Sequence, residues 1–180
     1  MTEIMQPQPR AQPESPSGAA ARTEAPSATH IPERYHRSVV PHIMVSDAEA
    51  AIAFYVAAFG AVEEFRLAHP QGGIMHAEIR IGESVLMLGD VSQGPFTAPA
   101  ELSGTSVALH VFVPDVDELA KRAVAAGAEL IQAPADQFHG DRTALLRDPS
   151  GHLWVFLTHL RNVSPEELLH GRAAAGDGHA

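Results

Sequence analysis

The stretch "PHIMVSD" at residues 41–47 has a near copy at residues 109–115, "LHVFVPD". Each copy places a histidine inside a short apolar run and ends in an Asp, a residue type that favours the start of a helix. Sixty-eight residues separate His42 from His110, and the same offset relates Asp47 to Asp115. A fixed offset of this kind indicates a duplicated supersecondary unit.

Each copy opens a segment in which one strand and one helix are followed by three more strands. The apolar spacing predicts helices over residues 47–60 and 115–127, the first of them ending at Gly60. Strand patterns follow at 61–67, 73–81 and 83–89 in the first copy and at 128–134, 142–148 and 152–158 in the second. The sequence therefore predicts an α+β fold made of two tandem βαβββ units, residues 36–90 and 105–159.

One folded domain is expected over residues 32–171, with a short helix at 164–171 that begins with a Ser and Glu capping box. Residues 1–31 are rich in Pro, Gln, Ser and Ala and contain few large apolar side chains. Such a segment buries too little surface to offset the entropy lost on ordering, so we expect it to be disordered. Residues 172–180 are expected to form a flexible tail.

Composition excludes several classes of function. The net charge of −10 argues against a general nucleic-acid-binding protein, which needs a basic surface. No apolar run reaches the roughly 20 residues that cross a membrane, so no membrane partner is expected. The chain has no cysteine, and its first residues lack the apolar core of a signal peptide. We therefore expect a cytoplasmic protein.

Four stretches of the sequence resemble one known superfamily. The paired βαβββ units, the helix ending "AIAFYVAAFGA" and the segment "RDPSGHLWVF" resemble the vicinal oxygen chelate superfamily, which includes glyoxalases, bleomycin-resistance proteins, fosfomycin-resistance enzymes and extradiol dioxygenases. The stretches "MHAEIRIGESVLML" and "DQFHGDRTALLRDPSGHLW" are more similar to its PhnB-like branch. The resemblance covers about residues 36–159. It implies a cupped sheet in each unit, a ligand cavity on the concave side and a homodimer.

The resemblance also implies where metal-dependent members place their ligands, which are usually His and Glu on the first and last strand of each unit. The corresponding residues of this chain are Val40, Met87, Ala108 and Val155. A catalytic metal needs at least three convergent protein ligands, and these side chains do not supply them. We therefore predict that the protein holds no metal and uses no cofactor.

The alternation of side chains along a strand assigns further residues to the concave face. His42 and His110 lie two residues beyond the expected ligand positions, so they belong to the same face. They either line the cavity or are hydrogen-bonded core histidines. The predicted floor of the cavity is apolar and consists of Val40, Met44, Met87, Ala108, Phe112 and Val155.

Two polar groups remain open to two interpretations each. His76 and Glu78 share the polar face of the strand at 73–81, where they either line the cavity as a base and a carboxylate or belong to a solvated outer face. The loop "DQFHGDR" either orients a polar ligand at the cavity rim or makes surface ion pairs. Its candidate ligand-binding residues are Gln137, His139, Asp141 and Arg142.

The leading prediction of function is a protein that binds an organic metabolite or an antibiotic-like molecule in the sheet cavity. The alternative is a metal-independent isomerase, cyclase or lyase in which His42, His110 or His76, with Glu78, acts as a general acid or base. A metal-dependent lyase or dioxygenase is disfavoured by the four residues at the ligand positions.

Overall fold

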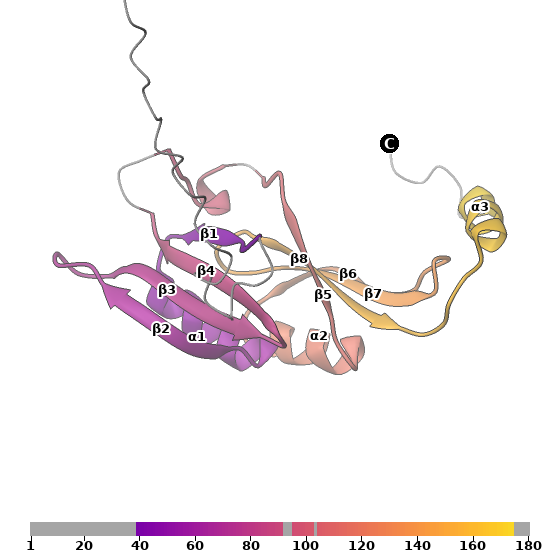
Figure 1. Cartoon of the computed structure of the whole chain (residues 1–180), viewed down its shortest axis with the longest axis horizontal. Coiled ribbons are helices and arrows are strands. Elements are labelled where there is room, and N and C mark those ends of the chain that lie inside the picture. Colours follow the sequence, from indigo (N-terminus) through magenta and orange to yellow (C-terminus); the bar gives the residue numbers. More distant parts are fainter. Residues whose placement is uncertain (1–38, 92–94, 103, 175–180) are drawn as a thin grey trace, which may run out of the picture. The chain divides into compact units, whose positions relative to one another are not determined.

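Residues 42–90 fold into one four-stranded sheet that carries one helix (Figure 1). This computed structural model describes residues 39–91, 95–102 and 104–174, and the predicted tail at 1–31 lies outside them. The strands follow the order β1-β4-β3-β2, in which β1 runs parallel to β4 and the other pairs are antiparallel. In chain order the elements are β1 (His42–Val45), α1 (Ala48–Phe59), β2 (Val62–Ala68), β3 (Ile74–Ile81) and β4 (Ser84–Asp90).

The second half repeats this topology. Its sheet has the order β5-β8-β7-β6, with β5 parallel to β8 and the other pairs antiparallel. The two tandem βαβββ units are thereby confirmed, and we call their sheets sheet A and sheet B. The elements of the second unit are β5 (Ala108–Phe112), α2 (Val116–Ala125), β6 (Glu129–Asp136), β7 (Asp141–Arg147) and β8 (Leu153–His159).

Within the described residues, two further helical segments lie outside the repeated units. The connector between the units contains a 3₁₀ turn, η3 (Pro99–Glu101), and the chain continues after β8 into α3 (Pro165–Ala174). The helix α3 begins with the predicted capping box, in which Ser164 and Glu167 exchange side-chain to backbone hydrogen bonds. It extends to residue 174, beyond the expected domain end at 171. In the described ranges, no helix has both the length and the apolarity needed to span a membrane.

Both main helices begin at the predicted Asp residues. The side chain of Asp47 accepts a hydrogen bond from the backbone of Ala50, and that of Asp115 accepts one from Glu118. Each of these bonds satisfies a backbone N–H group that the first helical turn leaves unpaired. Gly60 ends α1 with a φ of 69°, a left-handed conformation that suits glycine.

A second capping contact is duplicated together with the fold. Near the end of β4, the carboxylate of Asp90 accepts a hydrogen bond from the backbone N–H of Ala48, with a nitrogen–oxygen distance of 2.6 Å. The hydroxyl oxygen of Thr158 accepts the equivalent bond from Val116 at 2.9 Å. The last strand of each unit therefore holds the first residue of that unit's helix.

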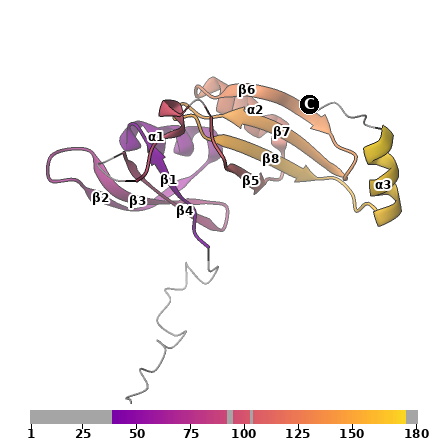
Figure 2. The ribbon, with the colours of Figure 1, turned by 90° about the horizontal axis from the view of Figure 1, so that it is seen from above.

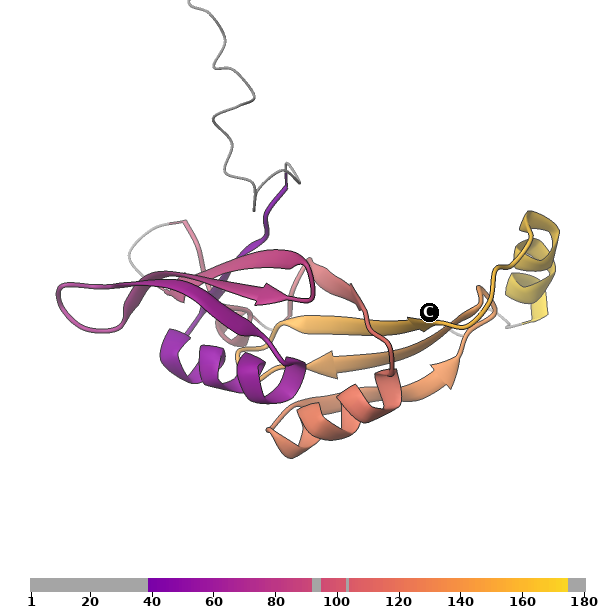
Figure 3. The same ribbon diagram turned by 60° about the horizontal axis from the view of Figure 1, so that its bottom comes forward.

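The helices cover one face of the sheets, as Figure 3 shows. On β1, Ile43 and Val45 are buried on the helix side, whereas His42 is exposed on the other side. We call this other side, opposite the helices, the open face of each sheet. The helix side forms one continuous core, in which the ring of Phe59 on α1 lies 4.9 Å from that of Trp154 on β8. Figure 2 shows the strands of the two sheets from above. Because Trp154 has the opposite strand parity to Val155, the sequence predicts that it packs under the helices, and this is confirmed.

Candidate functional site

The open face of sheet A brings together the histidines that were candidates on β1 and β3. In the strand register, His42 pairs with Met87, and Met87 pairs with Glu78 on its other side. Residues that pair across neighbouring strands point to the same face of a sheet. His76 lies two residues before Glu78 and therefore shares this face with it. Of the two interpretations of His76 and Glu78, the structure places them on the same face as His42.

These three side chains form a compact polar group. The imidazole rings of His42 and His76 meet edge to face with their centroids 5.5 Å apart. The Nε2 atom of His76 lies 3.5 Å from Oε1 of Glu78, at the limit of a hydrogen bond. Glu78 is only 5% exposed, although it lies on the face that carries no helix. We call His42, His76 and Glu78 the polar group of sheet A.

The electrostatics of the polar group favour a neutral His42. Partial burial lowers the pKa of His42, and the positive charge that His76 acquires on protonation lowers it further. A neutral imidazole has one nitrogen that donates a hydrogen bond and one that accepts. His42 is therefore suited both to binding a polar ligand and to accepting a proton.

Apolar side chains surround the polar group. Met44 and Met87 flank it on β1 and β4, and the ring of Phe65 on β2 lies 6.2 Å from that of His76. Phe65 is 47% exposed, so its ring offers contact area on the open face. The arrangement of a few polar groups within an apolar surface is typical of sites that bind small organic molecules.

The open face of sheet B has different chemistry at the equivalent positions. His110 pairs with Val155, and Val155 pairs with Leu145, which takes the place that Glu78 has in sheet A. His110 is exposed, as are its neighbours on the same face of β5, Ala108 and Phe112. The two duplicated histidines therefore lie on open faces rather than in the core, and the ring of His42 lies against that of His76.

The residues of the predicted rim loop separate onto two faces. Asp141 accepts from both His139 and His159, with nitrogen–oxygen distances of 3.2 and 2.8 Å. The amide of Gln137 makes a long contact of 3.4 Å with the carbonyl oxygen of Ala135. Asp141 pairs in register with His159 and lies two residues before Thr143, which pairs with Leu157. The side chain of Asp141 therefore lies on the open face of sheet B.

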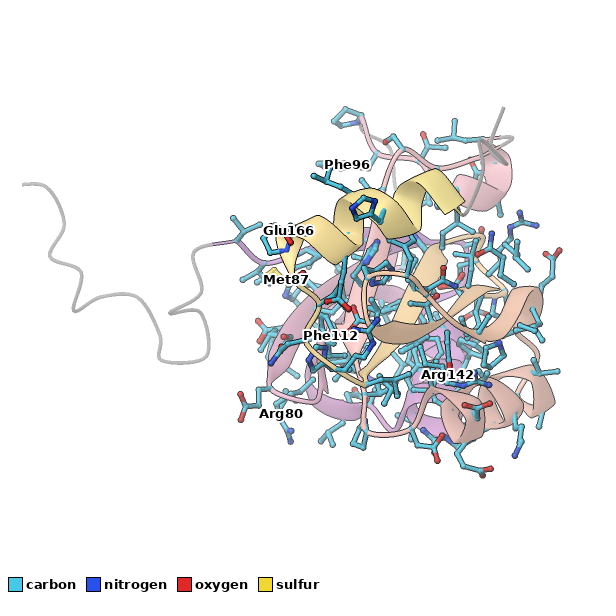
Figure 4. The ribbon with its side chains drawn as sticks, turned by 90° about the vertical axis from the view of Figure 1, so that its right-hand side faces the viewer. Arg80, Met87, Phe96, Phe112, Arg142 and Glu166 are labelled. Atoms are coloured by element: carbon cyan, nitrogen blue, oxygen red, sulfur yellow. The ribbon has the colours of Figure 1, made fainter. Side chains whose placement is uncertain are left out.

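Of the two interpretations of this loop, a ligand-orienting rim or surface ion pairs, the contacts of Arg142 agree with the ion pairs. Its guanidinium donates two hydrogen bonds to Asp117 on α2, at 2.6 and 2.8 Å, and a third to Asp136 on β6 at 2.7 Å. These bonds raise the pKa of Arg142 and hold its side chain on the helix side, as Figure 4 shows beside α2. The reason is the strand itself, because β7 already begins at Asp141 and the next residue must point to the opposite face. Figure 4 also shows Met87 and Phe112 lying away from Arg142.

The four residues that the resemblance assigns to metal-ligand positions carry neither an imidazole nor a carboxylate. Met87 and Val155 lie on the open faces, each in register with one of the duplicated histidines. Val40 and Ala108 provide no donor atom in their side chains. Over residues 39–91, 95–102 and 104–174, no group of three or more His, Asp or Glu side chains is arranged to hold a metal ion.

Sequence reasoning missed a buried network at the turn between β7 and β8. One oxygen of Asp148 accepts hydrogen bonds from the hydroxyl of Tyr55 at 2.7 Å and from the indole N–H of Trp154 at 2.8 Å. Its other oxygen accepts from the backbone N–H groups of Ser150 and His152, both at 2.9 Å. Burial raises the pKa of Tyr55, and the charge of Asp148 raises it further. The stretch "RDPSGHLW" contains Asp148 and Trp154, two members of this network. The third member, Tyr55, lies 93 residues from Asp148 in sequence.

Glycine is required in the same turn. Gly151 has a φ of 91°, and a side chain there would collide with η3, since an added Cβ would lie 2.8 Å from the backbone nitrogen of Ala100. The turn is therefore packed directly against the connector between the two units.

The comparison with known protein families agrees with this geometry. A profile of the Glyoxalase/Bleomycin resistance protein/Dioxygenase superfamily matches residues 34–156. The chain belongs to this superfamily. It is 42% identical over 142 residues to the uncharacterized protein Rv0887c of Mycobacterium tuberculosis, a match that covers 77% of this chain and 84% of that protein.

Solved structures of the superfamily share the same fold. TioX from Micromonospora sp. ML1 has a TM-score of 0.56 at 31% identity, covering 68% of this chain and 98% of that one. A glyoxalase/bleomycin resistance protein/dioxygenase family enzyme from Burkholderia phytofirmans PsJN has a TM-score of 0.54 at 26% identity, covering 66% and 95%. These relatives support two tandem βαβββ units as the architecture of the superfamily.

Proposed function

We propose that this superfamily member binds a small organic molecule, a metabolite or an antibiotic-like compound, on the open face of sheet A. The observation that carries the proposal is the polar group of His42, His76 and Glu78 within an apolar surface. A ligand would form hydrogen bonds with His42 and His76, while Met44, Met87 and Phe65 would contact its apolar part. The two stretches that resemble the PhnB-like branch support a place in that branch as a further proposal.

The binding step does not call for a metal ion at the four corresponding positions. Val40, Met87, Ala108 and Val155 lack the carboxylate and imidazole groups that such an ion prefers. The proposed ligand is therefore held by hydrogen bonds and apolar contact alone.

The proposal is tested by a binding screen on the full chain. A panel of aromatic and aliphatic compounds with hydrogen-bonding groups would be screened by NMR, and each hit measured by calorimetry. For a hit, we expect His76→Gln and Glu78→Gln to weaken binding by about 1–3 kcal/mol, the cost of an unmatched buried polar group. The matched control is His170→Gln on the exposed α3, which should leave affinity unchanged. Hits whose affinity is insensitive to His42, His76 and Glu78 would contradict the site.

A second function is favoured by one specific observation, the lowered pKa of His42. A neutral imidazole beside a second histidine and a carboxylate suits general acid–base catalysis of an isomerisation, cyclisation or elimination without a metal. In that case His42→Gln or His76→Gln would lower turnover of a bound compound by roughly 10²–10⁴-fold while its affinity changes far less. If a compound binds and is not turned over, the result supports the first function, ligand binding without catalysis.

We also propose that the protein is a homodimer. The open faces expose large apolar side chains, including Phe112 at 66% and Phe65 at 47%. Exposed apolar surface of this kind marks sites of association. Light scattering at micromolar concentration tests the proposal, and a monomeric mass would contradict it.

A further inference from the structure

The edge strand that carries His42 is held by a side chain from the other unit. The strand β1 lies at the edge of sheet A, next to β4 only. The carbonyl oxygen of Pro41 accepts a hydrogen bond from Met87 on β4, and that of Val45 accepts one from Val91, the residue after β4. Because the carbonyl groups of a strand alternate in direction, that of Met44 points away from β4, toward the free edge.

His152 satisfies this outward carbonyl group. Its Nε2 atom lies 2.9 Å from the oxygen of Met44, which can only accept, so the Nε2 atom carries the proton. His152 is 8% exposed, and its bond joins residues 108 positions apart in sequence. A buried donor in a strand-edge contact of this kind is costly to remove, since the carbonyl would lose its partner.

His152 is itself held rigidly. Its backbone N–H donates to Asp148, and its carbonyl oxygen accepts from the backbone of Asp148 at 3.0 Å. Asp148 is fixed in turn by Tyr55 on α1 and by Trp154 on β8. The ring of His152 therefore projects from a turn that cannot easily shift, and it meets β1 two residues after His42.

We propose that His152 is a positioning residue of the site on sheet A, which fixes β1 so that the ring of His42 stays against the ring of His76. His152 does not touch the polar group and acts through the backbone of Met44. The proposal assigns a role to His152, the histidine of the "DPSGH" turn, which lies on the helix side of the other unit. This proposal rests on the proposed function in one respect, that the polar group of sheet A is a binding site.

The experiment is histidine NMR on the full chain, with the chain's 11 histidines isotopically labelled and His42, His76 and His152 assigned from single variants. In the unmodified protein we expect a nuclear Overhauser effect between the rings of His42 and His76. His152→Phe keeps the ring volume without a donor and should lose this contact. It should also move the titration of His42 upward, toward that of an ordinary histidine. His152→Gln, whose amide can donate to Met44, should restore both signals.

His110 provides the internal control, because it occupies the equivalent position on β5 and its ring signals at a fixed pH should be the same in all variants. A folded His152→Phe protein with an unchanged His42–His76 contact and an unchanged His42 titration would overturn the proposal. If His152→Phe does not fold, the NMR chemical shifts of the imidazole nitrogens in the unmodified protein test the proposal instead. Finding His152 protonated on Nδ1 rather than Nε2, while His42 and His76 remain in contact, would equally overturn it. None of these signals needs a ligand, so the result is independent of whether the proposed binding function holds.

Discussion

The hydroxyl of Tyr55 donates a 2.7 Å hydrogen bond to the carboxylate of Asp148, which joins the helix of the first unit to the last turn of the second. The same carboxylate oxygen also accepts from the indole of Trp154. Both donors and the acceptor are almost fully buried, in the region where α1 packs against sheet B. This small network is a main polar connection between the two units.

The first prediction concerns the stability that this network provides. Tyr55→Phe removes a hydrogen bond to a buried charged acceptor and should lower the free energy of unfolding by about 1.5–3 kcal/mol. Asp148→Asn should lower it further, because an amide can accept from fewer of the four donors. Urea denaturation measures both values. Glu49→Gln on the exposed side of α1 is the control, and a Tyr55→Phe protein as stable as this control would contradict the prediction.

The second prediction concerns the coupling of the two histidines on sheet A. His76→Gln removes the neighbouring positive charge, which is the second cause of the lowered pKa of His42, but leaves its partial burial. The pKa of His42 should therefore rise without reaching that of an exposed histidine. NMR titration of the ring protons measures the change. A titration of His42 that does not respond to His76→Gln would show that the two rings do not interact.

The third prediction concerns pH at the far end of sheet B. The hydrogen bond to Asp141 raises the pKa of His159. The His159–Asp141 pair therefore stabilises the fold fully when the pH is below about 6.5, the ordinary pKa of histidine. This stabilisation is lost as the pH rises through the raised pKa of His159. Asp141→Asn should bring the titration of His159 down toward that of exposed histidines. His69, on the hairpin between β2 and β3, is the reference and should not change.

The fourth prediction concerns metal content. Purified protein should contain less than about one equivalent of zinc, nickel, manganese or iron per chain, because the four corresponding positions offer no suitable donors. Elemental analysis after dialysis provides the measurement. Stoichiometric metal that is released by a chelator, and whose release changes the NMR signals of His42 or His110, would show that the open faces do bind an ion.

Local rules predicted most of the fold. The offset between His42 and His110 predicted the duplication, and the capping preference of Asp located the starts of both helices. The alternation of side chains along β8 correctly assigned Trp154 to the core. These features depend on residues close together in sequence, whose geometry follows from the backbone alone.

The site was harder to predict because it depends on contacts between distant strands. The pattern of β3 showed that His76 and Glu78 share a face but could not decide which face carries the helix. The sequence left Arg142 with two interpretations, because the start of β7 decides which way its side chain points. The partners of Asp148 and His152 lie 93 and 108 residues away, so no local pattern could identify them.

The paired contacts of Asp90 with Ala48 and of Thr158 with Val116 have a consequence for the covalent chain. Each closes its own unit over a span of 42 residues, so neither unit needs the connector to complete its helix and sheet. The units are joined instead by Tyr55, Phe59, Trp154 and His152. We therefore expect fragments produced by cutting the chain between β4 and η3 to reassociate when mixed. Native-like tryptophan fluorescence from Trp154 would report the complementation, and fragments that stay apart would refute it.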